Sequence, residues 1–209
     1  MTIQEILSRS PVIPVVTISK LDDALPLADA LLEGGVPIIE VTLRTPAAPD
    51  AIRRIAAERP EMTLGVGTIW SRHDLRIALD AGAVFGVSPG ATADLLDAVT
   101  EAGLPFLPGA QTPSEVAERR DRGFEAVKFF PAGPAGGPAA LGAMAAVFPD
   151  LKFCPTGGVS AGNAREYLAI PNVPVVGGSW LTPKVAVAQG DWKTVTRLAR
   201  ETQQLRTGD

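Results

Sequence analysis

A lysine stands inside an apolar run of this 209-residue chain, at Lys128 in Ala126-Val127-Lys128-Phe129-Phe130-Pro131. Burying a charged ammonium is costly, and a desolvated lysine escapes the cost by giving up its proton. The free amine can then attack a ketone and form a Schiff base. The alternative is a lysine at a strand end whose ammonium reaches solvent or pairs with a carboxylate. Lys128 is therefore a candidate nucleophile whose role depends on the residues around it.

A second set of polar residues interrupts the apolar run 38–45. Glu40, Thr42 and Arg44 alternate with other residues, and the two-residue period of a strand predicts that they share one face. One interpretation is a buried Glu40–Arg44 ion pair with a purely structural role. The other gives Glu40 the work of a general acid/base beside a neutral lysine amine. Arg44 would then hold a substrate carboxylate through a forked, charge-assisted contact.

Two Gly-Gly pairs lie near the C-terminal end, in Pro155-Thr156-Gly157-Gly158-Val159-Ser160 and Val176-Gly177-Gly178-Ser179-Trp180-Leu181. They predict a concavity lined by backbone N–H groups, at which the following helices aim their positive dipole ends, and such a cup binds phosphate. The alternative is that the glycines only make tight turns. The segments Gly65-Val66-Gly67-Thr68, Ser88-Pro89-Gly90 and Pro108-Gly109-Ala110 end three other predicted strands. They either contact a ligand, with Pro89 as a candidate substrate contact, or turn the chain into the next helix.

The elements that position these residues alternate between short β-rich runs and Ala/Leu-rich helical patterns, several of which open on a capping Ser, Thr or Asp. Eight such units predict a (β/α)₈ barrel in one domain, residues 1–209, with a short helix at Thr2–Ser8 covering its bottom. An open doubly wound sheet is the alternative. The strands are expected at Val12–Thr17, Ile38–Leu43, Thr63–Thr68, Ala83–Ser88, Pro105–Ala110, Ala126–Phe130, Lys152–Thr156 and Val173–Gly178. The helices are expected at Leu21–Glu33, Ala47–Arg59, Ser71–Ala81, Ala93–Ala102, Pro113–Arg122, Pro138–Val147, Ala161–Leu168 and Asp191–Leu205.

Composition narrows the class of function. The net charge of −4 and an aromatic content of 5% disfavour a nucleic-acid or membrane-surface partner. A single cysteine, Cys154, and an N-terminus unlike a signal peptide predict a cytoplasmic protein. His73 is the only histidine and is expected to be solvated, so no metal and no cofactor are expected. Cys154 is expected to be a small buried hydrophobe, and Trp180 and Trp192 to pack against the barrel.

Taken together, the motifs resemble those of the bacterial 2-keto-3-deoxy-6-phosphogluconate (KDPG) aldolases. The matching motifs span nearly the whole chain in order, as Glu40 to Thr45, Gly65 to Thr68, Ser88 to Gly90, Lys128 to Ala132, Phe153 to Gly158 and Gly177 to Leu181. The resemblance implies a metal-independent class I aldolase of the Entner–Doudoroff pathway. Such an enzyme splits the keto acid phosphate into pyruvate and glyceraldehyde 3-phosphate, and it is typically a homotrimer.

The resemblance also implies the role of each residue. The position matching Lys128 forms the Schiff base, and the one matching Glu40 moves protons through water. The positions matching Arg44 and Thr68 bind the pyruvate carboxylate. The phosphate is held by those matching Thr156, Gly157, Gly158 and Ser179, and the one matching Phe130 packs near the substrate.

One departure from the family pattern lies at Gly133, where many members carry a glutamate. It changes the shape and charge of the loop beside Lys128 and bears on substrate preference more than on mechanism. The galactonate-derived epimer of the substrate and the unphosphorylated 4-hydroxy-2-oxoglutarate (KHG) are therefore alternative substrates. More distant alternatives are a phosphosugar isomerase or epimerase and a non-catalytic phosphate-ligand binding barrel. A lysine within an apolar strand favours the aldolase over both.

Overall fold

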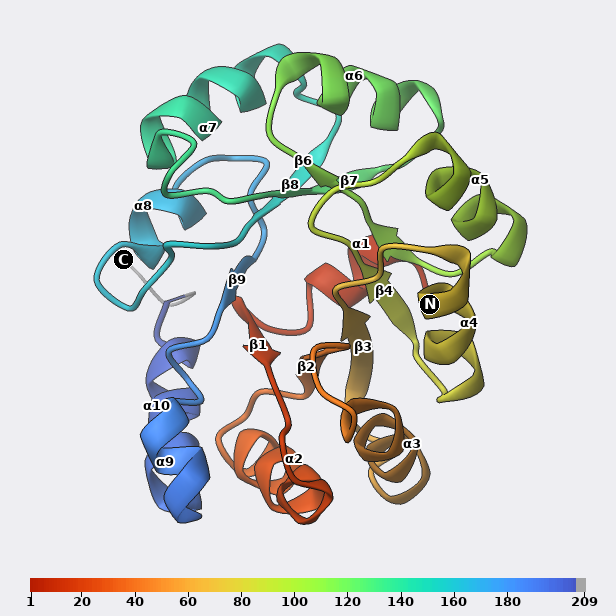
Figure 1. Ribbon diagram of the computed structural model, residues 1–209. Helices are drawn as coiled ribbons and strands as arrows, with labels where there is room; N and C mark the ends of the chain where they lie inside the picture. Colours follow the sequence, from red (N-terminus) through yellow and green to blue (C-terminus); the bar gives the residue numbers. More distant parts are fainter. Residues whose placement is uncertain (206–209) are drawn as a thin grey trace.

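The computed structural model describes residues 1–205, whose parallel strands form a closed ring surrounded by helices (Figure 1). The strands are β1 (Val12–Val16), β2 (Ile38–Thr42), β3 (Thr63–Gly67), β4 (Phe85–Val87), β5 (Phe106–Leu107), β6 (Gly109–Ala110), β7 (Ala126–Phe129), β8 (Lys152–Pro155) and β9 (Val176–Gly178). They pair in the orders β5-β4-β3-β2-β1-β9 and β6-β7-β8. A parallel bridge between Thr156 and Gly177 joins the two sheets on one side, and β5 continues into β6 on the other. The predicted (β/α)₈ barrel is confirmed, with β5 and β6 as two halves of one strand.

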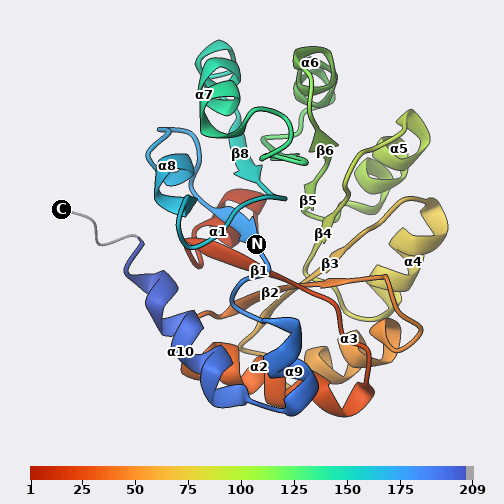
Figure 2. The ribbon, with the colours of Figure 1, turned by 60° about the vertical axis from the view of Figure 1, so that its left-hand side comes forward.

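The helices form the outer layer (Figure 2), and several of them begin at a capping side chain. Ser71, Thr92 and Thr112 each accept a hydrogen bond from a backbone N–H in the first turn of the helix that follows, which the helix itself cannot satisfy. No helix within residues 1–205 is long and apolar enough to span a membrane. After the short helix α1 (Ile3–Leu7) and the 3₁₀ turn η1 (Leu21–Asp23), the helices are α2 (Ala24–Glu33), α3 (Ala48–Glu58), α4 (Arg72–Asp80), α5 (Ala93–Ala102), α6 (Pro113–Asp121), α7 (Gly137–Val147), α8 (Ala164–Leu168), α9 (Lys184–Gln189) and α10 (Trp192–Gln203).

Prolines explain where these elements depart from prediction. The strand expected over 105–110 is interrupted at Pro108, which has no N–H to give to the ladder. The strand expected over 173–178 is regular only in its second half, after Pro174. Helix α9, which follows Pro183, was not predicted at all. The order and type of the core elements were therefore predicted correctly. The differences lie at strand interruptions, at one unpredicted short helix and at element ends, such as the start of α8 at Ala164 and the 3₁₀ turn before α2.

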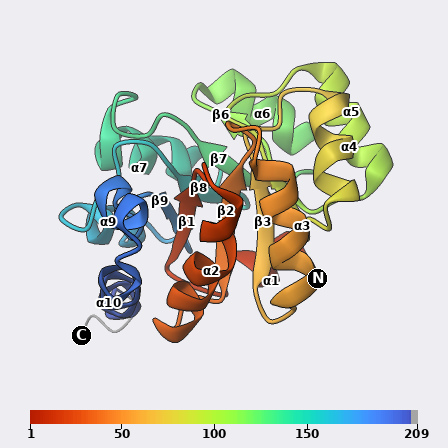
Figure 3. The same cartoon turned by 60° about the horizontal axis from the view of Figure 1, so that its bottom comes forward.

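Helix α1 closes the end of the barrel at which the strands begin. Its Ile6 and Leu7 are buried, and Gln4 donates a hydrogen bond to Glu125, directly before β7. In Figure 1 the red segment of α1 lies inside the outline of the ring. In Figure 3 strands β1, β2 and β3 run side by side, in agreement with their parallel pairing. The carboxyl ends of the strands are thus left free to build a site, as in other barrels of this kind.

Candidate active site

A cavity of about 470 Å³ opens at the carboxyl ends of the strands. Its walls come from the residues that close β1, β7 and β9 and from the loops that follow β2, β8 and β9. Most of the predicted site residues line it, namely Lys128, Arg44, Phe130, Thr156, Gly157, Gly158 and Ser179. Two of the others contact members of this set. The barrel therefore assembles in one place residues that lie far apart in the sequence.

Lys128 and Glu40 meet inside the barrel although they are 88 positions apart. The Lys128 Nζ lies 3.4 Å from Glu40 Oε1, and each side chain is only 4% exposed. The buried amine and the buried carboxylate are therefore each other's polar partners. Lys128 thus pairs with the carboxylate predicted to move protons.

Glycines on the neighbouring strands make room for the functional side chains. A Cβ atom built on Gly67 would lie 2.1 Å from Glu40 Oε1, and one on Gly177 would lie 2.2 Å from Thr156 Oγ1. Both distances are far below van der Waals contact, so a side chain at either position would displace Glu40 or Thr156 from its place. The glycines of the 65–68 segment were predicted to let the backbone approach a ligand. In the structure Gly67 makes room for the side chain of Glu40, and the approach of a ligand to this backbone stays a prediction.

Arg44 lies beyond the end of β2 and turns toward Thr68. Its Nε donates a hydrogen bond of 3.0 Å to Thr68 Oγ1. Thr68 has a φ of 65°, the only positive value at a non-glycine position within residues 1–205, and a left-handed conformation costs about 1–2 kcal/mol for such a residue. Strain of this kind clusters at functional sites. The structural interpretation of a Glu40–Arg44 ion pair is wrong, because Glu40 pairs with Lys128 and the strand ends before Arg44.

The glycine loop after β8 adopts a backbone that other residues rarely reach. Gly157 and Gly158 have φ values of 88° and 83°. The N–H groups of Gly158 and Ser179 have no hydrogen-bond acceptor among the described residues, so both remain available to an anion. The helix after β8 does not supply the dipole expected there, because α8 begins only at Ala164, after a turn, and is five residues long, whereas α9 after β9 begins at Lys184 in the cavity wall. Backbone amides and side chains are the groups at this end that could bind an anion.

The departure at Gly133 affects how the loops after β7 and β8 pack together. The Gly133 N–H donates to the Gly157 carbonyl at 2.8 Å. A Cβ on Gly133 would lie 3.2 Å from the Gly158 Cα, which is tighter than most real contacts. The absence of a side chain at position 133 thus lets the two loops lie close together beside the cavity.

Thr17 and Lys184 line the cavity but were not predicted as site residues. Thr17 directly follows an apolar strand. It could have been found from the sequence, because barrel sites are built from residues at the carboxyl ends of the strands. Lys184, by contrast, belongs to the unpredicted helix α9. Pro89 is half-buried and does not belong to the cavity lining, so its substrate contact stays a prediction. Its carbonyl packs so close to Gly109 that a Cβ there would lie 2.2 Å away. Pro89 therefore shapes the rim of the barrel.

The residues set aside at the sequence level behave as expected. Cys154 is buried, and this burial raises the pKa of its thiol to about 12. His73 is exposed on α4, and Trp180 and Trp192 pack against the core. Within residues 1–205, no cluster of three or more His, Cys, Asp or Glu side chains could hold a metal ion. The ring of Phe130 lies with its centroid 5.2 Å from Lys128 Nζ, at the mouth of the buried pair.

An amine buried beside a carboxylate and open to a cavity on one side is the arrangement that Schiff-base enzymes need. On a (β/α)₈ barrel, this arrangement defines the class of Schiff-base aldolases. A family model described as KDPG and KHG aldolase matches residues 3–198, and the chain belongs to this family. That membership decides against the isomerase and the non-catalytic binding barrel.

Individual relatives resemble the chain over nearly its whole length. The KHG/KDPG aldolase of Escherichia coli (strain K12) is 48% identical over 198 residues, which cover 95% of this chain and 93% of the relative. The KDPG aldolase of Legionella pneumophila, solved with pyruvate captured as a covalent carbinolamine intermediate, is 42% identical with a TM-score of 0.95, covering 97% and 98% of the two chains. The aldolase of Zymomonas mobilis ZM4, solved with 3-phosphoglycerate, is 41% identical with a TM-score of 0.91, covering 97% and 95%.

Proposed function

We propose that this protein cleaves KDPG to pyruvate and glyceraldehyde 3-phosphate, with Lys128 as the Schiff-base lysine. The observation that carries the proposal is the buried contact between Lys128 Nζ and Glu40 Oε1, at 3.4 Å. Lys128 also lines the cavity, so its amine is open to a substrate on the side away from Glu40.

Lys128 begins the reaction as a neutral amine that attacks the C2 ketone of the substrate. The carbinolamine that forms loses water and becomes an iminium. This positively charged nitrogen accepts the electron pair of the C3–C4 bond as that bond breaks, so no metal is needed. The carbinolamine captured in the Legionella pneumophila relative is the corresponding intermediate in that protein.

Glu40 handles the protons of the reaction, directly or through a water molecule. It removes the proton of the C4 hydroxyl, so that C4 leaves as the aldehyde of glyceraldehyde 3-phosphate and C3 remains in an enamine. A proton returned to C3 converts the enamine into the iminium of pyruvate, and hydrolysis frees pyruvate and the lysine. A positioned proton donor and acceptor of this kind contributes about 10² to 10⁴ in rate.

The two ends of the substrate are held by different parts of the cavity. Arg44 and Thr68 bind the carboxylate next to the ketone, and their 3.0 Å hydrogen bond orients the guanidinium for this task. The phosphate is held by Thr156, Gly157, Gly158 and Ser179, while Phe130 packs beside the chain between the two ends. Binding energy from the remote phosphate is then used to orient the C3–C4 bond.

KHG is a second candidate substrate, because the Escherichia coli relative carries the name KHG/KDPG aldolase. The galactonate-derived epimer of KDPG is a third, since it has the same carboxylate and phosphate ends. The unbonded amides of Gly158 and Ser179 at the far end of the cavity favour a phosphorylated substrate over KHG. By family expectation the protein is a homotrimer, which light scattering would measure directly.

Trapping with pyruvate and borohydride tests the proposal. The wild-type protein is expected to gain the mass of one reduced pyruvyl group, and peptide mapping should place it on Lys128. Lys128→Met keeps the side-chain volume without the amine, and it should lose both the adduct and KDPG cleavage. Lys152→Met is the matched control, because Lys152 begins β8 at the opposite end of the barrel and should leave both unchanged. An adduct on another lysine would show that the nucleophile is wrongly assigned.

A further inference from the structure

The cavity is lined by basic residues although the protein as a whole is acidic. The basic side chains are those of Arg44, Lys128 and Lys184, of which Lys128 is paired with Glu40, and no described Asp or Glu lines the cavity. The whole chain carries a net charge of −4. In the proposed function Arg44 binds the carboxylate end and Lys128 forms the imine. Lys184 is the remaining cation, and no role has been given to it.

Lys184 has no partner that would explain its position structurally. Lys184 is exposed, and its side chain makes no ion pair or hydrogen bond with any other residue of the described range 1–205. On the adjacent helix α10, by contrast, Arg197 pairs with Glu201 and Arg200 pairs with Glu33. The charge of Lys184 is therefore free to act on a bound anion.

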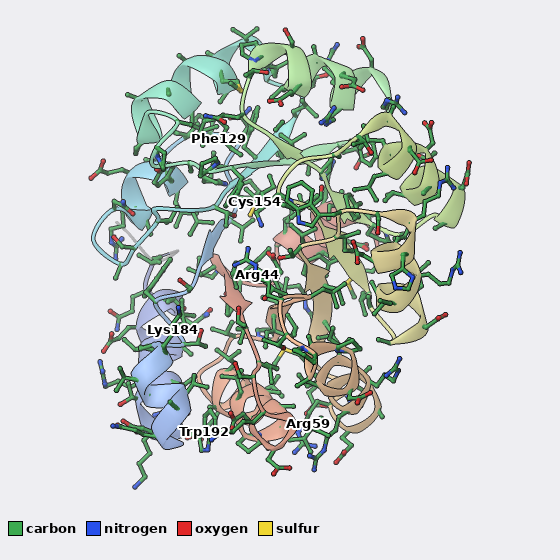
Figure 4. All side chains as sticks on the ribbon, in the orientation of Figure 1. Arg44, Arg59, Phe129, Cys154, Lys184 and Trp192 are labelled. Carbon is green, nitrogen blue, oxygen red and sulfur yellow. The ribbon has the colours of Figure 1, made fainter. Side chains whose placement is uncertain are left out.

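The loop before Lys184 fixes it next to the amides of the anion-binding end. The Thr182 N–H and the Thr182 hydroxyl both donate to the Ser179 carbonyl, at 3.2 and 3.4 Å. Leu181 is fully buried, which anchors the same turn. Lys184 thus follows Ser179 across a closed turn and shares the cavity with Ser179 and Gly158. In Figure 4 Lys184 lies at the start of α9, whereas Arg44 lies near the middle of the ring.

We propose that Lys184 determines specificity for a phosphorylated substrate by supplying the positive charge at the phosphate end of the cavity. This inference rests on the proposed function, since it deepens the assignment of that end. A phosphate monoester carries a charge of about −1.5 to −2 at pH 7, and the glycine amides offer only neutral donors. Lys184 acts on the bound substrate and on the transition state alike, so it lowers KM and leaves kcat unchanged.

The test compares Lys184→Ala with Lys193→Ala, which removes the same charge from α10 on the outside of the barrel. For KDPG we expect Lys184→Ala to raise KM about ten-fold, the effect of one charge-assisted contact reduced by solvent. Lys193→Ala should leave KM at the wild-type value, and Lys184→Arg should restore most of the affinity. The excess KM of Lys184→Ala over wild type should shrink as salt rises, because screening weakens the lost contact.

The same variants are assayed with 2-keto-3-deoxygluconate, which is the same keto acid without the phosphate, and with pyruvate exchange in D₂O. Lys184→Ala should change neither. A KM for KDPG equal to that of Lys193→Ala would overturn the role of Lys184 while leaving the aldolase assignment intact. An equal rise of KM for both keto acids would also overturn it, because the effect would not depend on phosphate. Failure of the proposed function is distinct, since the wild-type protein would then form no pyruvate adduct.

Discussion

Glu40→Gln removes the proton-transfer group while keeping the size and the hydrogen-bonding shape of the side chain. Glu40 Oε1 lies 3.4 Å from Lys128 Nζ in a site where both side chains are 4% exposed. Glu40 reaches the site through its contact with Lys128, and no carboxylate among the described residues lines the cavity itself, so none can take the place of Glu40. Loss of a positioned general acid/base lowers the rate by about 10² to 10⁴. This corresponds to about 3–5 kcal/mol of activation free energy, at about 1.36 kcal/mol for each factor of ten.

The same substitution changes the free energy of unfolding by less than the bare attraction suggests. Two unit charges 3.4 Å apart attract by about 5 kcal/mol at an effective dielectric constant of about 20. The cost of removing both charges from water offsets much of this. We therefore expect a folded protein with a modestly lowered Tm.

The assay separates imine formation from proton transfer. Trapping of pyruvate by borohydride on Lys128 should persist in Glu40→Gln, because the amine is still present. KDPG turnover and the exchange of pyruvate methyl protons with solvent deuterium should both fall steeply. Glu40→Asp is the matched control, since it keeps a carboxylate on a side chain that is shorter by one methylene. Its rates of turnover and exchange should lie between those of the wild type and those of Glu40→Gln. Undiminished exchange in Glu40→Gln would reduce Glu40 to a structural partner of Lys128.

Three further changes test other parts of the site. Ser179→Asp places a carboxylate where the phosphate should lie, and like charges a few ångströms apart repel by several kcal/mol. KM for KDPG should rise sharply while pyruvate trapping stays unchanged. A normal KM would place the phosphate elsewhere. Thr68→Gly relieves the strain at φ 65° but removes the hydroxyl that holds Arg44. The Tm should therefore change little while KM for pyruvate exchange rises. An unchanged KM would contradict the role of that hydrogen bond. Cys154, whose pKa is raised to about 12 by burial, stays protonated at pH 8, so iodoacetamide should label it only after unfolding; labelling of the native protein at the unfolded rate would contradict this burial.

The fold was predictable because the features that determine its strands and helices are local in the sequence. Strands buried on both faces read as apolar runs, and a capping hydroxyl such as Thr112 marks where a helix starts. The break at Pro108 and the late start of β9 could be predicted only with the strand pairing in hand. A proline interrupts a strand where a neighbouring strand would have accepted a hydrogen bond from the missing N–H. Helix α9 is too short to show a periodic pattern, so the sequence could not reveal it.

The site was predictable to the extent that strand geometry determines it. Lys128 and Glu40 each occupy the third position of a strand and meet in the lumen, as the alternation of side chains requires. Arg44 lines the cavity as predicted, but β2 ends at Thr42, so a loop and not the strand alternation decides where its side chain turns. Lys184 was not predicted from the sequence, because its place beside the cavity depends on the turn that follows Ser179.

The glycines show why a motif can be recognised before its physical reason is known. Gly67 and Gly177 lie within strands, where a glycine weakens the strand and usually signals the close approach of another group. In this barrel the approaching groups are the carboxylate of Glu40 and the hydroxyl of Thr156, each of which fills the space of the missing side chain. The inward polar residue and the glycine on the adjacent strand are thus one feature. Only the parallel register, which places Thr42 beside Gly67, brings its two parts together.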